Sequence, residues 1–451
     1  MDADGDALMW HRFRSFDRSV QLLMLNQFAI NTGFYMLMPY LAGHLAHGLG
    51  MATWTVALVL AMRNLSQQGL FLLGGALADR LGYRPVIIVG CLLRTCGFAL
   101  LGFAATLPAL LVASAMTGLA GALFNPAVRA YLAHDAKDRR VEGFALFNVF
   151  YQAGILAGPL IGVALMTTGF PLVCWAAAAV FALLTVLQLL ALPSCHSTTD
   201  GPTGLLAGWR IVVKNRPFLL FTLAMSTSYV LAFQIYLALP LHLGSTGGVS
   251  ALFVVSAVVA IGGQLRITVW ARTRWSSGQA ITRGLALMAL AFLPLAITSW
   301  TGTGCCDGMR LTAVLTCTVM LALGSALTYP FEMDTVVLLA RERLVATHYG
   351  LYNTVAGIGI TLGNVLIGTL LGSSVRPAPW LLLAAAGTSG AIAVHFLTRG
   401  GHATDALPSE ALTASQPKPE EPRPDTSAAK SDGIAGLTTP LGARAAGDRP
   451  R

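Results

Sequence analysis

Twelve long apolar stretches limit what this chain can fold into. Each holds about 20 residues or more, the length that an α-helix needs to cross the hydrocarbon core of a bilayer. They lie near residues 20–43, 52–78, 84–105, 107–132, 143–168, 170–192, 217–243, 249–271, 280–301, 310–340, 345–372 and 379–398. Charged residues make up only 11% of the chain, whereas a soluble domain carries about a quarter. The sequence therefore predicts an all-α integral membrane protein with twelve transmembrane helices.

The twelve stretches fall into two sets of six, which gives a predicted domain organisation. We expect a cytoplasmic N-terminus over 1–19, a six-helix bundle over 20–192, a central cytoplasmic connection over 193–216, a second six-helix bundle over 217–398 and a disordered cytoplasmic tail over 399–451. The tail has too few apolar residues to form a core. The connection alternates apolar and basic residues, so it could be an amphipathic helix on the inner leaflet or a plain tether.

The two sets also repeat each other in sequence. The segments that begin at Gly121 and Gly324 share small residues, a proline, a charged turn, a glycine and an aromatic-Asn pair. A repeat of six helices in one orientation implies two bundles related by an axis along the membrane normal. We therefore expect a ligand cavity between the bundles, near the middle of the membrane.

Basic residues lie on alternate connections, and this sets the expected orientation. Arginine or lysine occurs before the first stretch, after the second, fourth, eighth and tenth, and in the central connection; only Arg310 and Arg376 break the pattern. Cytoplasmic loops collect such residues, so both termini are predicted to be cytoplasmic. The net charge of +9 then needs no nucleic-acid partner, because basic loops lie beside an anionic leaflet.

Two short motifs stand out. The connection over residues 74–85, GGALADRLGYRP, places glycines, an acid and two arginines between apolar stretches. Asp79 there could accept hydrogen bonds from a neighbouring helix N-terminus, or the segment could be only a basic loop. The fifth stretch contains AGILAGPLIG, in which Gly154, Gly158 and Gly162 are spaced by four and Pro159 bends the helix. Such glycines form a smooth face for helix packing.

Together these motifs resemble those of the major facilitator superfamily. GGALADRLGYRP looks like its signature between helices two and three, and AGILAGPLIG looks like its fifth-helix antiporter motif. The layout covers about residues 20–398, and the chain is most similar to bacterial drug:proton antiporters of the MdtH-like branch, through LAMRNLSQQGLFLLGGALADR and CLLRTCGFALLG. The resemblance implies the major facilitator fold and a location in the cell membrane of a bacterium. It also implies export, because the family associates the fifth-helix motif with export.

The resemblance also implies roles for particular residues. The gating motif, which bridges the two bundles on the cytoplasmic side in the family, is carried here by Gly75, Asp79, Arg80, Gly82 and Arg84. The sequence departs from the family pattern at Tyr83, where a basic residue is common. It also has Ser114 four residues before Gly118, where the family places a fourth-helix arginine used in proton relay.

Charged residues inside the apolar stretches are candidates for function, because burying a charge in a bilayer costs at least about 2–3 kcal/mol. Arg63 and Arg94 could stabilise polar groups, bind an anionic part of a substrate, or serve helix packing. Glu332 and Asp334 are the acids expected within the membrane, and we favour Glu332 as the proton carrier. In the competing interpretation both acids lie near the cytoplasmic helix end, paired with Arg341 or Arg343.

Polar and aromatic residues within the stretches are expected to line the cavity. The candidates are Asn26, Gln27, Asn31, Tyr35, Tyr151, Gln152, Tyr229, Gln234, Tyr236 and Asn353. Such a surface suits apolar or amphipathic compounds of varied shape, although any one of these residues could simply link helices.

The functional hypothesis is a proton-coupled exporter of small hydrophobic or amphipathic compounds, such as a drug or antibiotic. The alternative is a metabolite uptake symporter or facilitator on the same fold, and a non-transporting receptor is a third possibility. We find no phosphate loop, nucleophile elbow or metal-ligand spacing among the seven cysteines, so we expect neither an enzyme nor a metal site. The expected partners are a small-molecule substrate, protons and the lipid bilayer. We expect a monomer with no cofactor beyond the proton gradient.

Overall fold

The structure is a computed structural model that describes residues 3–195, 204–244, 246–301, 307–372 and 375–399. Contacts divide the chain into two compact units, Met1–Leu407 and Pro408–Arg451. The second unit lies outside the described residues, as do residues 400–407, so the predicted disordered tail is not described beyond its first residue. Two of the seven cysteines, Cys305 and Cys306, also lie outside the described residues. Across the described ranges every regular element is helical, which confirms the predicted all-α class.

The first half of the chain forms six long helices and three short elements. They are α1 (Ala3–Arg14), α2 (Arg18–Gly43), η1 (His44–Gly48), α3 (Thr53–Leu81), α4 (Tyr83–Phe103), α5 (Leu107–Ala136), η2 (Lys137–Arg139), α6 (Arg140–Met166) and α7 (Phe170–Ala191). The long helices α2–α7 correspond to the first six apolar stretches.

The second half continues the pattern with two interruptions. Its elements are α8 (Leu205–Lys214), α9 (Arg216–Phe233), α10 (Ala238–Leu243), α11 (Thr246–Arg272), α12 (Ser277–Leu290), α13 (Leu293–Thr301), α14 (Asp307–Leu339), α15 (Val345–Leu371) and α16 (Ala378–Arg399). The seventh stretch breaks between α9 and α10, and the ninth between α12 and α13. Pro240 and Pro294 cause these breaks, because a proline ring clashes with the carbonyl four residues earlier, at Tyr236 and Leu290.

The helices are long and apolar enough to cross a membrane. Ten described stretches meet this condition, and one of them, Leu107–Met166, contains both α5 and α6. Helix α2 has 26 residues but falls short in apolar content, because Asn26, Gln27 and Asn31 lower its hydropathy. The predicted twelve spans thus correspond to these ten stretches, the division of Leu107–Met166, and α2.

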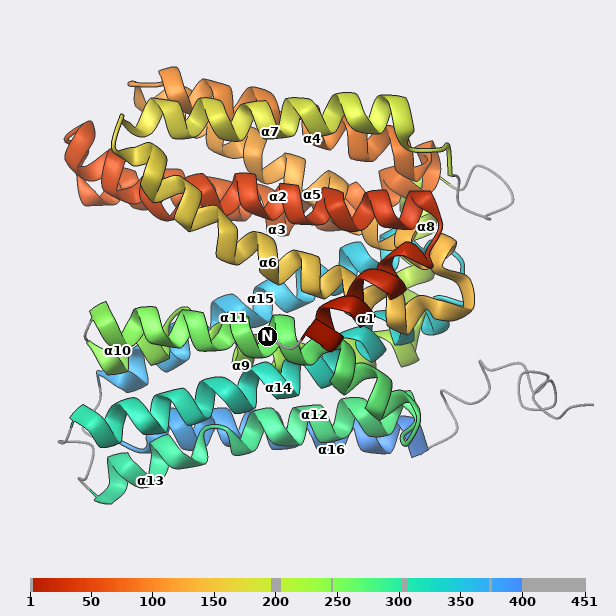
Figure 1. The fold of residues 1–451 in the computed structure, drawn as a ribbon, viewed down its shortest axis with the longest axis vertical. Helices are drawn as coiled ribbons and strands as arrows, with labels where there is room; N and C mark the ends of the chain where they lie inside the picture. Colours follow the sequence, from red (N-terminus) through yellow and green to blue (C-terminus); the bar gives the residue numbers. More distant parts are fainter. Residues whose placement is uncertain (1–2, 196–203, 245, 302–306, 373–374, 400–451) are drawn as a thin grey trace, which may run out of the picture. The chain divides into compact units, whose positions relative to one another are not determined.

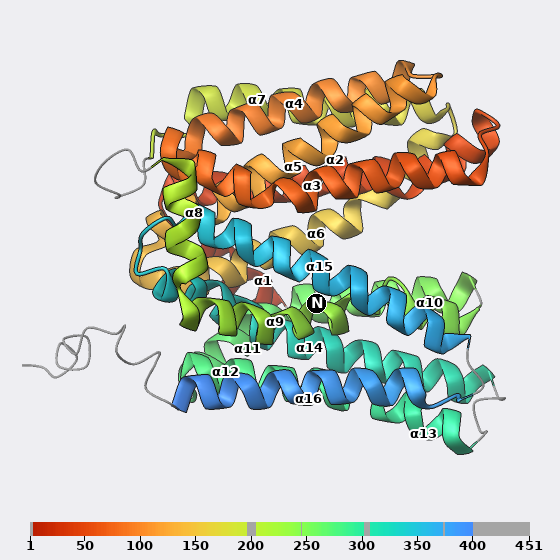
Figure 2. The ribbon, with the colours of Figure 1, turned by 180° about the vertical axis from the view of Figure 1, so that it is seen from behind.

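The long helices pack as two bundles (Figure 1). In the first, α3 and α4 pack on α5, α4 on α7, and α2 on α6 and α7. In the second, α12 packs on α14 and α16, α11 on α14, and α9 on α15 and α16. The bundles meet where α3 contacts α15 and where α6 contacts α11 and α14. Helix α8 lies at one end of the bundles, beside the end of α3 and the start of α15 (Figure 2). The helix ends and turns there carry Arg80, Arg84, Arg140 and Arg341, so we call it the basic end.

Two short helices lie at the basic end. Helix α1 was not predicted, whereas an amphipathic helix was one of the two alternatives for the segment that forms α8. The predicted polar N-terminus forms α1, where Arg12 donates to Glu142 at 2.9 Å and the Phe13 ring lies 5.3 Å from that of Phe150. The central connection forms α8, in which Val212 is buried while Leu206 and Val213 are exposed. With apolar residues exposed on its outer face, α8 has the character of an amphipathic helix rather than of a plain tether.

Glycines in α6 allow a close contact with α2. A Cβ atom at Gly154 would lie 2.5 Å from the Phe28 carbonyl oxygen, and one at Gly162 would lie 2.2 Å from that of Met36. Between them, Gly158 lies against Tyr35. Pro159 lies inside α6, which continues through it, and its carbonyl oxygen accepts a hydrogen bond from the Tyr40 hydroxyl at 2.8 Å. The AGILAGPLIG motif therefore builds the α2–α6 interface of the first bundle.

Replacing Gly162 should loosen this bundle. In Gly162→Ala, the new methyl group would meet the Met36 carbonyl oxygen, and overpacking of this kind costs about 1–3 kcal/mol. We expect a lower thermal unfolding temperature of the purified protein. The matched control is Gly368→Ala in α15, where nothing lies within 4 Å of the added atom. Equal stability of the two variants would contradict the assignment of Gly162 to a backbone contact.

Candidate functional site

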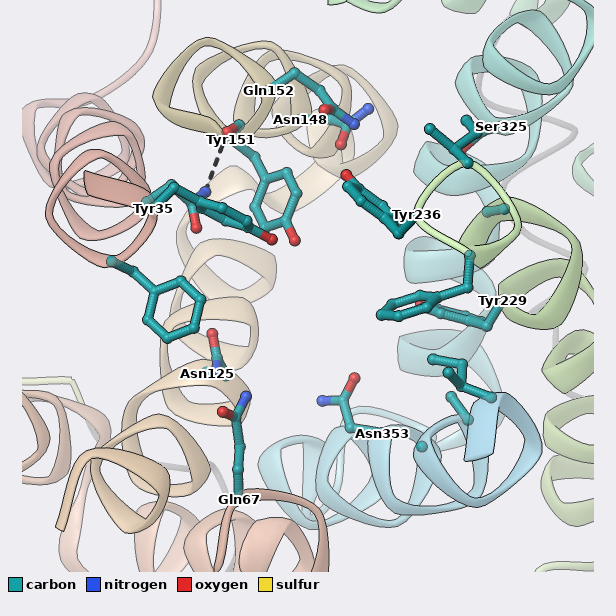
Figure 3. Close-up of a pocket in the computed structure, with 18 of the residues that line it drawn as sticks. Tyr35, Gln67, Asn125, Asn148, Tyr151, Gln152, Tyr229, Tyr236, Ser325 and Asn353 are labelled. Atoms are coloured by element: carbon teal, nitrogen blue, oxygen red, sulfur yellow. Dashed lines mark hydrogen bonds between the residues drawn. The ribbon is translucent and has the colours of Figure 1, made fainter. Parts of the chain in front are cut away.

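A cavity of about 370 Å³ lies between the two bundles and is lined by residues of both. Figure 3 shows Tyr35 and Tyr151 from α2 and α6 facing the same space as Tyr229 and Asn353 from α9 and α15. The lining consists of amide, aromatic and aliphatic side chains in similar numbers, together with three arginines. It combines hydrogen-bonding groups with flat apolar surfaces.

Most of the predicted lining residues reach this cavity. They are Asn31, Tyr35, Tyr151, Gln152, Tyr229, Tyr236 and Asn353. Asn31 also donates a hydrogen bond to the Tyr151 carbonyl oxygen at 3.1 Å, drawn as the dashed line in Figure 3. That residue therefore joins α2 to α6 as well as facing the cavity.

Three of the predicted lining residues do not line the cavity, and these predictions are corrected here. Asn26 is buried on the side of α2 that faces α7, where it accepts a hydrogen bond from Gln188 at 2.8 Å. Gln27 is buried and is also absent from the lining. Gln234 lies at the break after α9, and its amide donates to the Val230 carbonyl oxygen at 2.7 Å. Asn26 and Gln234 therefore form hydrogen bonds within their own bundles, and polar groups in a membrane need such partners.

Several polar lining residues were missed. They are Asn64, Gln67, Gln68, Asn125, Arg129, Asn148, Ser256, Gln264 and Ser325. Three of them take part in hydrogen bonds between the bundles: Asn148 donates to Gln264 at 2.7 Å, and Arg129 donates to Asn353 at 3.1 Å. The signal that could have found them is an amide or guanidinium within an apolar stretch, the same signal that pointed to Asn31.

Arg63 and Arg94 both line the cavity. Each guanidinium carbon lies 5.1 Å from the centroid of the Phe34 ring, so the two charges face one aromatic side chain. Arg94 donates to the Thr117 carbonyl oxygen at 2.8 Å, one turn of α5 beyond buried Ser114. A Cβ atom at Gly121 would lie 2.7 Å from the Arg94 Nη2 atom, so this glycine makes room for the arginine.

Glu332 lies in a side pocket of the cavity. The pocket has a volume of about 50 Å³ and shares Tyr229, Ala232 and Ser325 with the larger cavity. The carboxylate is 3% exposed and accepts a hydrogen bond from the Tyr352 hydroxyl. Arg341 and Arg343 are exposed, and neither forms a salt bridge with Glu332 in the described part of the chain. The competing interpretation, which pairs both acids with these arginines, therefore does not hold for Glu332.

Asp334 lies away from this pocket. It is half-buried, it does not line the cavity, and its charged neighbours are Arg140, Arg272 and Glu342. Two residues along a helix correspond to a rotation of about 200°, which explains why the two acids face different surroundings. Asp334 belongs to the charged network of the basic end.

Asp79 joins the two bundles at the basic end. Its carboxylate accepts hydrogen bonds from the backbone N–H groups of Ala346 at 3.1 Å and Thr347 at 2.8 Å, and from the Thr347 hydroxyl at 2.6 Å. These N–H groups belong to the first turn of α15, where they have no partner within the helix. A carboxylate at this position also interacts favourably with the positive end of the helix dipole.

Glycine contacts bring the backbones of α3 and α15 together beside Asp79. A Cβ atom at Gly75 would lie 2.1 Å from the Ala346 carbonyl oxygen, and one at Gly350 would lie 2.5 Å from that of Phe71. Side chains at either position would separate the helices. The short distance from Asp79 to α15 therefore depends on Gly75.

The other members of the gating motif remain within the first bundle. Gly82 has φ of 91°, a value that favours glycine, and it forms the turn between α3 and α4. Arg84 donates to the Leu189 carbonyl oxygen at 2.6 Å in the last turn of α7, and Arg80 is exposed. The ion pair between the bundles is formed by other residues, Arg140 and Glu342.

One cluster of possible metal ligands lies at the basic end, where sequence spacing gave no sign of it. His134, Asp135 and Cys195 place ligand atoms within 4.8 Å of one another. Burial raises the pKa of the Cys195 thiol to about 12, and the nearby Asp135 carboxylate adds to this rise. Metal ligation would require this thiol to lose its proton, and a bound cation itself favours that loss.

Two helical bundles around a polar cavity, joined at one end, define the class of secondary membrane transporters. The sequence pattern of the Major Facilitator Superfamily matches residues 23–364. The chain belongs to this superfamily, as the resemblance predicted, and its members are transporters rather than enzymes.

Relatives in other organisms share most of the chain. An uncharacterized MFS-type transporter of Mycobacterium tuberculosis is 51% identical over 371 residues, which cover 81% of this chain and 88% of the relative. The multidrug resistance protein MdtH of Edwardsiella ictaluri is 30% identical over 371 residues, covering 80% and 89%. The crystal structure of the human organic anion transporter MFSD10 superposes with a TM-score of 0.59 at 16% identity, covering 84% of this chain and 99% of that one. The last comparison shows a common fold.

Neutralising Asp79 should weaken the contact between the bundles. In Asp79→Asn, the charge-assisted hydrogen bonds to α15 are lost or reduced, which costs about 1–3 kcal/mol. The fraction of molecules with an open basic end should rise about tenfold, with a smaller effect on ligand affinity. Double electron–electron resonance would measure the distance between spin labels at exposed Lys137 and Arg274, which lie in different bundles. Asp138→Asn, which removes an exposed charge, is the control. An unchanged distance distribution in Asp79→Asn would contradict the bridging role.

Replacing Gly75 should open the same end by a different route. The methyl group of Gly75→Ala would meet the Ala346 carbonyl oxygen and push α15 away from α3. The same pair of labels should report longer distances than in the parent protein. Gly69→Ala, in the same helix with nothing within 4 Å of the added atom, should leave them unchanged. Identical behaviour of the two alanine variants would refute the contact.

Proposed function

We propose that the protein is a proton-coupled exporter of small hydrophobic or amphipathic compounds, among them drugs or antibiotics. The observation that carries this proposal is the aromatic and amide cavity between the bundles, with the buried carboxyl group of Glu332 in its side pocket. Relatives named multidrug resistance protein MdtH, at 30% identity and similar length, support the class of substrate. The AGILAGPLIG interface supports export through its resemblance to the antiporter motif.

The contacts of the basic end suggest how the transport cycle is organised. Positive charge gathers at that end, which favours placing it, together with both termini, on the cytoplasmic side of the cell membrane. The structure then represents a state closed toward the cytoplasm by the Asp79–α15 contact and the Arg140–Glu342 ion pair. Release of these contacts would let the bundles rock and expose the cavity to the cytoplasm.

Glu332 is the proposed proton carrier. Its carboxyl group is buried, adjoins the cavity and accepts a hydrogen bond from Tyr352, so a change in its charge would act directly on the substrate site. Acidic groups at such positions in membrane helices commonly serve proton transfer. The inward proton gradient would be the driving force, without a further cofactor. We propose a monomer in the lipid bilayer, with no nucleic-acid partner.

Uptake together with protons is the second candidate, and the charges of the cavity favour it. Ser114 stands where the family's relay arginine is expected, while Arg63 and Arg94 line the cavity from α3 and α4. A positively charged cavity would bind an anionic metabolite better after a nearby acid is protonated. Binding of both in the same step is the condition for symport.

Proton movement in inverted membrane vesicles distinguishes these candidates. Adding substrate compounds to energised vesicles should release protons from the lumen if the protein is an antiporter, as a pH-sensitive dye would show. Glu332→Gln should abolish this release, whereas loss in Asp334→Asn alone would move the carrier to the basic end. Proton movement in the same direction as the substrate would favour symport. Absence of any proton movement across a broad panel would reject proton coupling.

A further inference from the structure

We infer that the cavity selects organic anions, with the carboxylate, sulfonate or phosphate group of the ligand held by Arg63 and Arg94. The inference rests on the proposed function in one respect, that this cavity is the transport site, and it is independent of the direction of transport. It narrows the class of small amphipathic compounds to those with a negative charge.

The balance of charge around the cavity is the first argument. Three guanidinium groups line it, those of Arg63, Arg94 and Arg129, whereas Glu332 in the side pocket is the one carboxylate that the described residues place beside it. None of the three arginines forms a salt bridge within the described ranges. Buried charges are ordinarily paired, because an unpaired charge in a medium of low dielectric constant is costly. Within the described residues, the cavity thus holds more positive charge than the single carboxylate of Glu332 can balance.

The geometry of Arg63 and Arg94 is the second argument. Both guanidinium carbons lie 5.1 Å from the centroid of the Phe34 ring, so their separation is at most twice that distance. Arg63 donates to the neighbouring Asn64 side chain, and Arg94 to the Thr117 carbonyl oxygen. A guanidinium group carries five N–H donors, so most of the donors of this pair have no protein acceptor. Guanidinium donors bind carboxylate, sulfonate and phosphate oxygens strongly, so the donors beside Phe34 favour an anionic group in this part of the cavity.

Unsatisfied donors are the third argument. Arg94 is 3% exposed, yet its Nε atom has no hydrogen-bond partner, and the Nε atom of Arg129 is likewise buried without one. Leaving a buried charged donor unpaired costs more than about 1–3 kcal/mol. An anionic ligand in the cavity would supply a countercharge to these arginines, whereas a cationic ligand would add a fourth positive charge.

The remaining surface of the cavity suits the apolar body of such a ligand. Phe34 and Phe124 lie beside the arginines, and Tyr35 and Phe71 line the cavity from the same bundle. Tyr229 and Tyr236 face the cavity from the second bundle. Aromatic faces pack against rings and alkyl chains with little demand on shape. Selectivity would then come from the charge of the head group, and tolerance from the aromatic walls.

The position of Glu332 beside the cavity predicts how its charge affects the binding of an anion. An ionised Glu332 carries the same sign of charge as the ligand, so removing its charge should not weaken anion binding. Glu332→Gln should therefore bind the anion at least as tightly as the parent protein, even if it no longer couples transport to protons. This variant separates ligand recognition from coupling.

Calorimetric titration of the purified full chain in nanodiscs tests the inference. The probes are a matched set of naphthylalkyl compounds that differ only in the head group, carboxylate or sulfonate against trimethylammonium. The parent should bind the anions at least about tenfold more tightly than the cation, and Arg63→Gln or Arg94→Gln should lower anion affinity by about tenfold. Arg94→Lys should restore part of it. Arg283→Gln, which removes an exposed arginine outside the cavity, should bind as the parent does.

Anions that bind no more tightly than the cation across the set, or Arg63 and Arg94 variants that are folded but bind as the parent does, overturn the inference and leave these arginines as packing groups. Weaker probe binding in nanodiscs with phosphatidylglycerol than in phosphatidylcholine alone identifies a lipid head group as a competing anion at the same site. Anion binding without proton movement in vesicles retains the substrate class and rejects proton-coupled export.

Discussion

The hydrogen bonds from the first turn of α15 to Asp79 are the interaction on which the arrangement of the two bundles depends. They satisfy N–H groups that no residue of α15 itself could pair, and they place a negative charge at the positive end of a helix dipole. The interaction needs α3 and α15 in backbone contact, which Gly75 and Gly350 permit. The Arg140–Glu342 pair and the Asn148–Gln264 and Arg129–Asn353 hydrogen bonds then continue the contact toward the cavity.

Close packing of helices also stabilises each bundle internally. Apolar surface gains little from leaving lipid for protein, so helices associate through close packing and polar contacts. In the first bundle Gly154, Gly158 and Gly162 seat α6 on α2, and Asn31 adds a hydrogen bond to the Tyr151 carbonyl oxygen. The cavity lies where this packing stops and amide side chains replace the small residues.

The sequence predicted the helices better than the directions of their side chains. Length and apolar content located all the long helices, because a bilayer admits few alternatives, but Pro240 and Pro294 were not recognised as the causes of two breaks. Polar residues within the stretches indicated a cavity, yet Asn26 and Gln234 satisfy neighbouring groups instead, while Arg129 and Gln264 do line it. Which side of a helix faces a neighbour depends on its rotation in the bundle, and a single sequence does not give that rotation. Helix α1 was missed because its apolar residues are few, and the contact of Phe13 with Phe150 of α6 cannot be read from the sequence.

The two proline breaks give the second bundle a division that the first lacks. Helices α9 and α12 end inside the bundle, and α10 and α13 continue as short segments joined to them by a few residues. Such junctions act as hinges, because the backbone there is released from the helical hydrogen-bond ladder. The outer rim of the second bundle can therefore tilt while the contacts at the basic end stay intact. The break after α9 lies beside the cavity, because Phe233, Ile235 and Tyr236 line it, so a tilt of α10 would change the shape of the cavity directly.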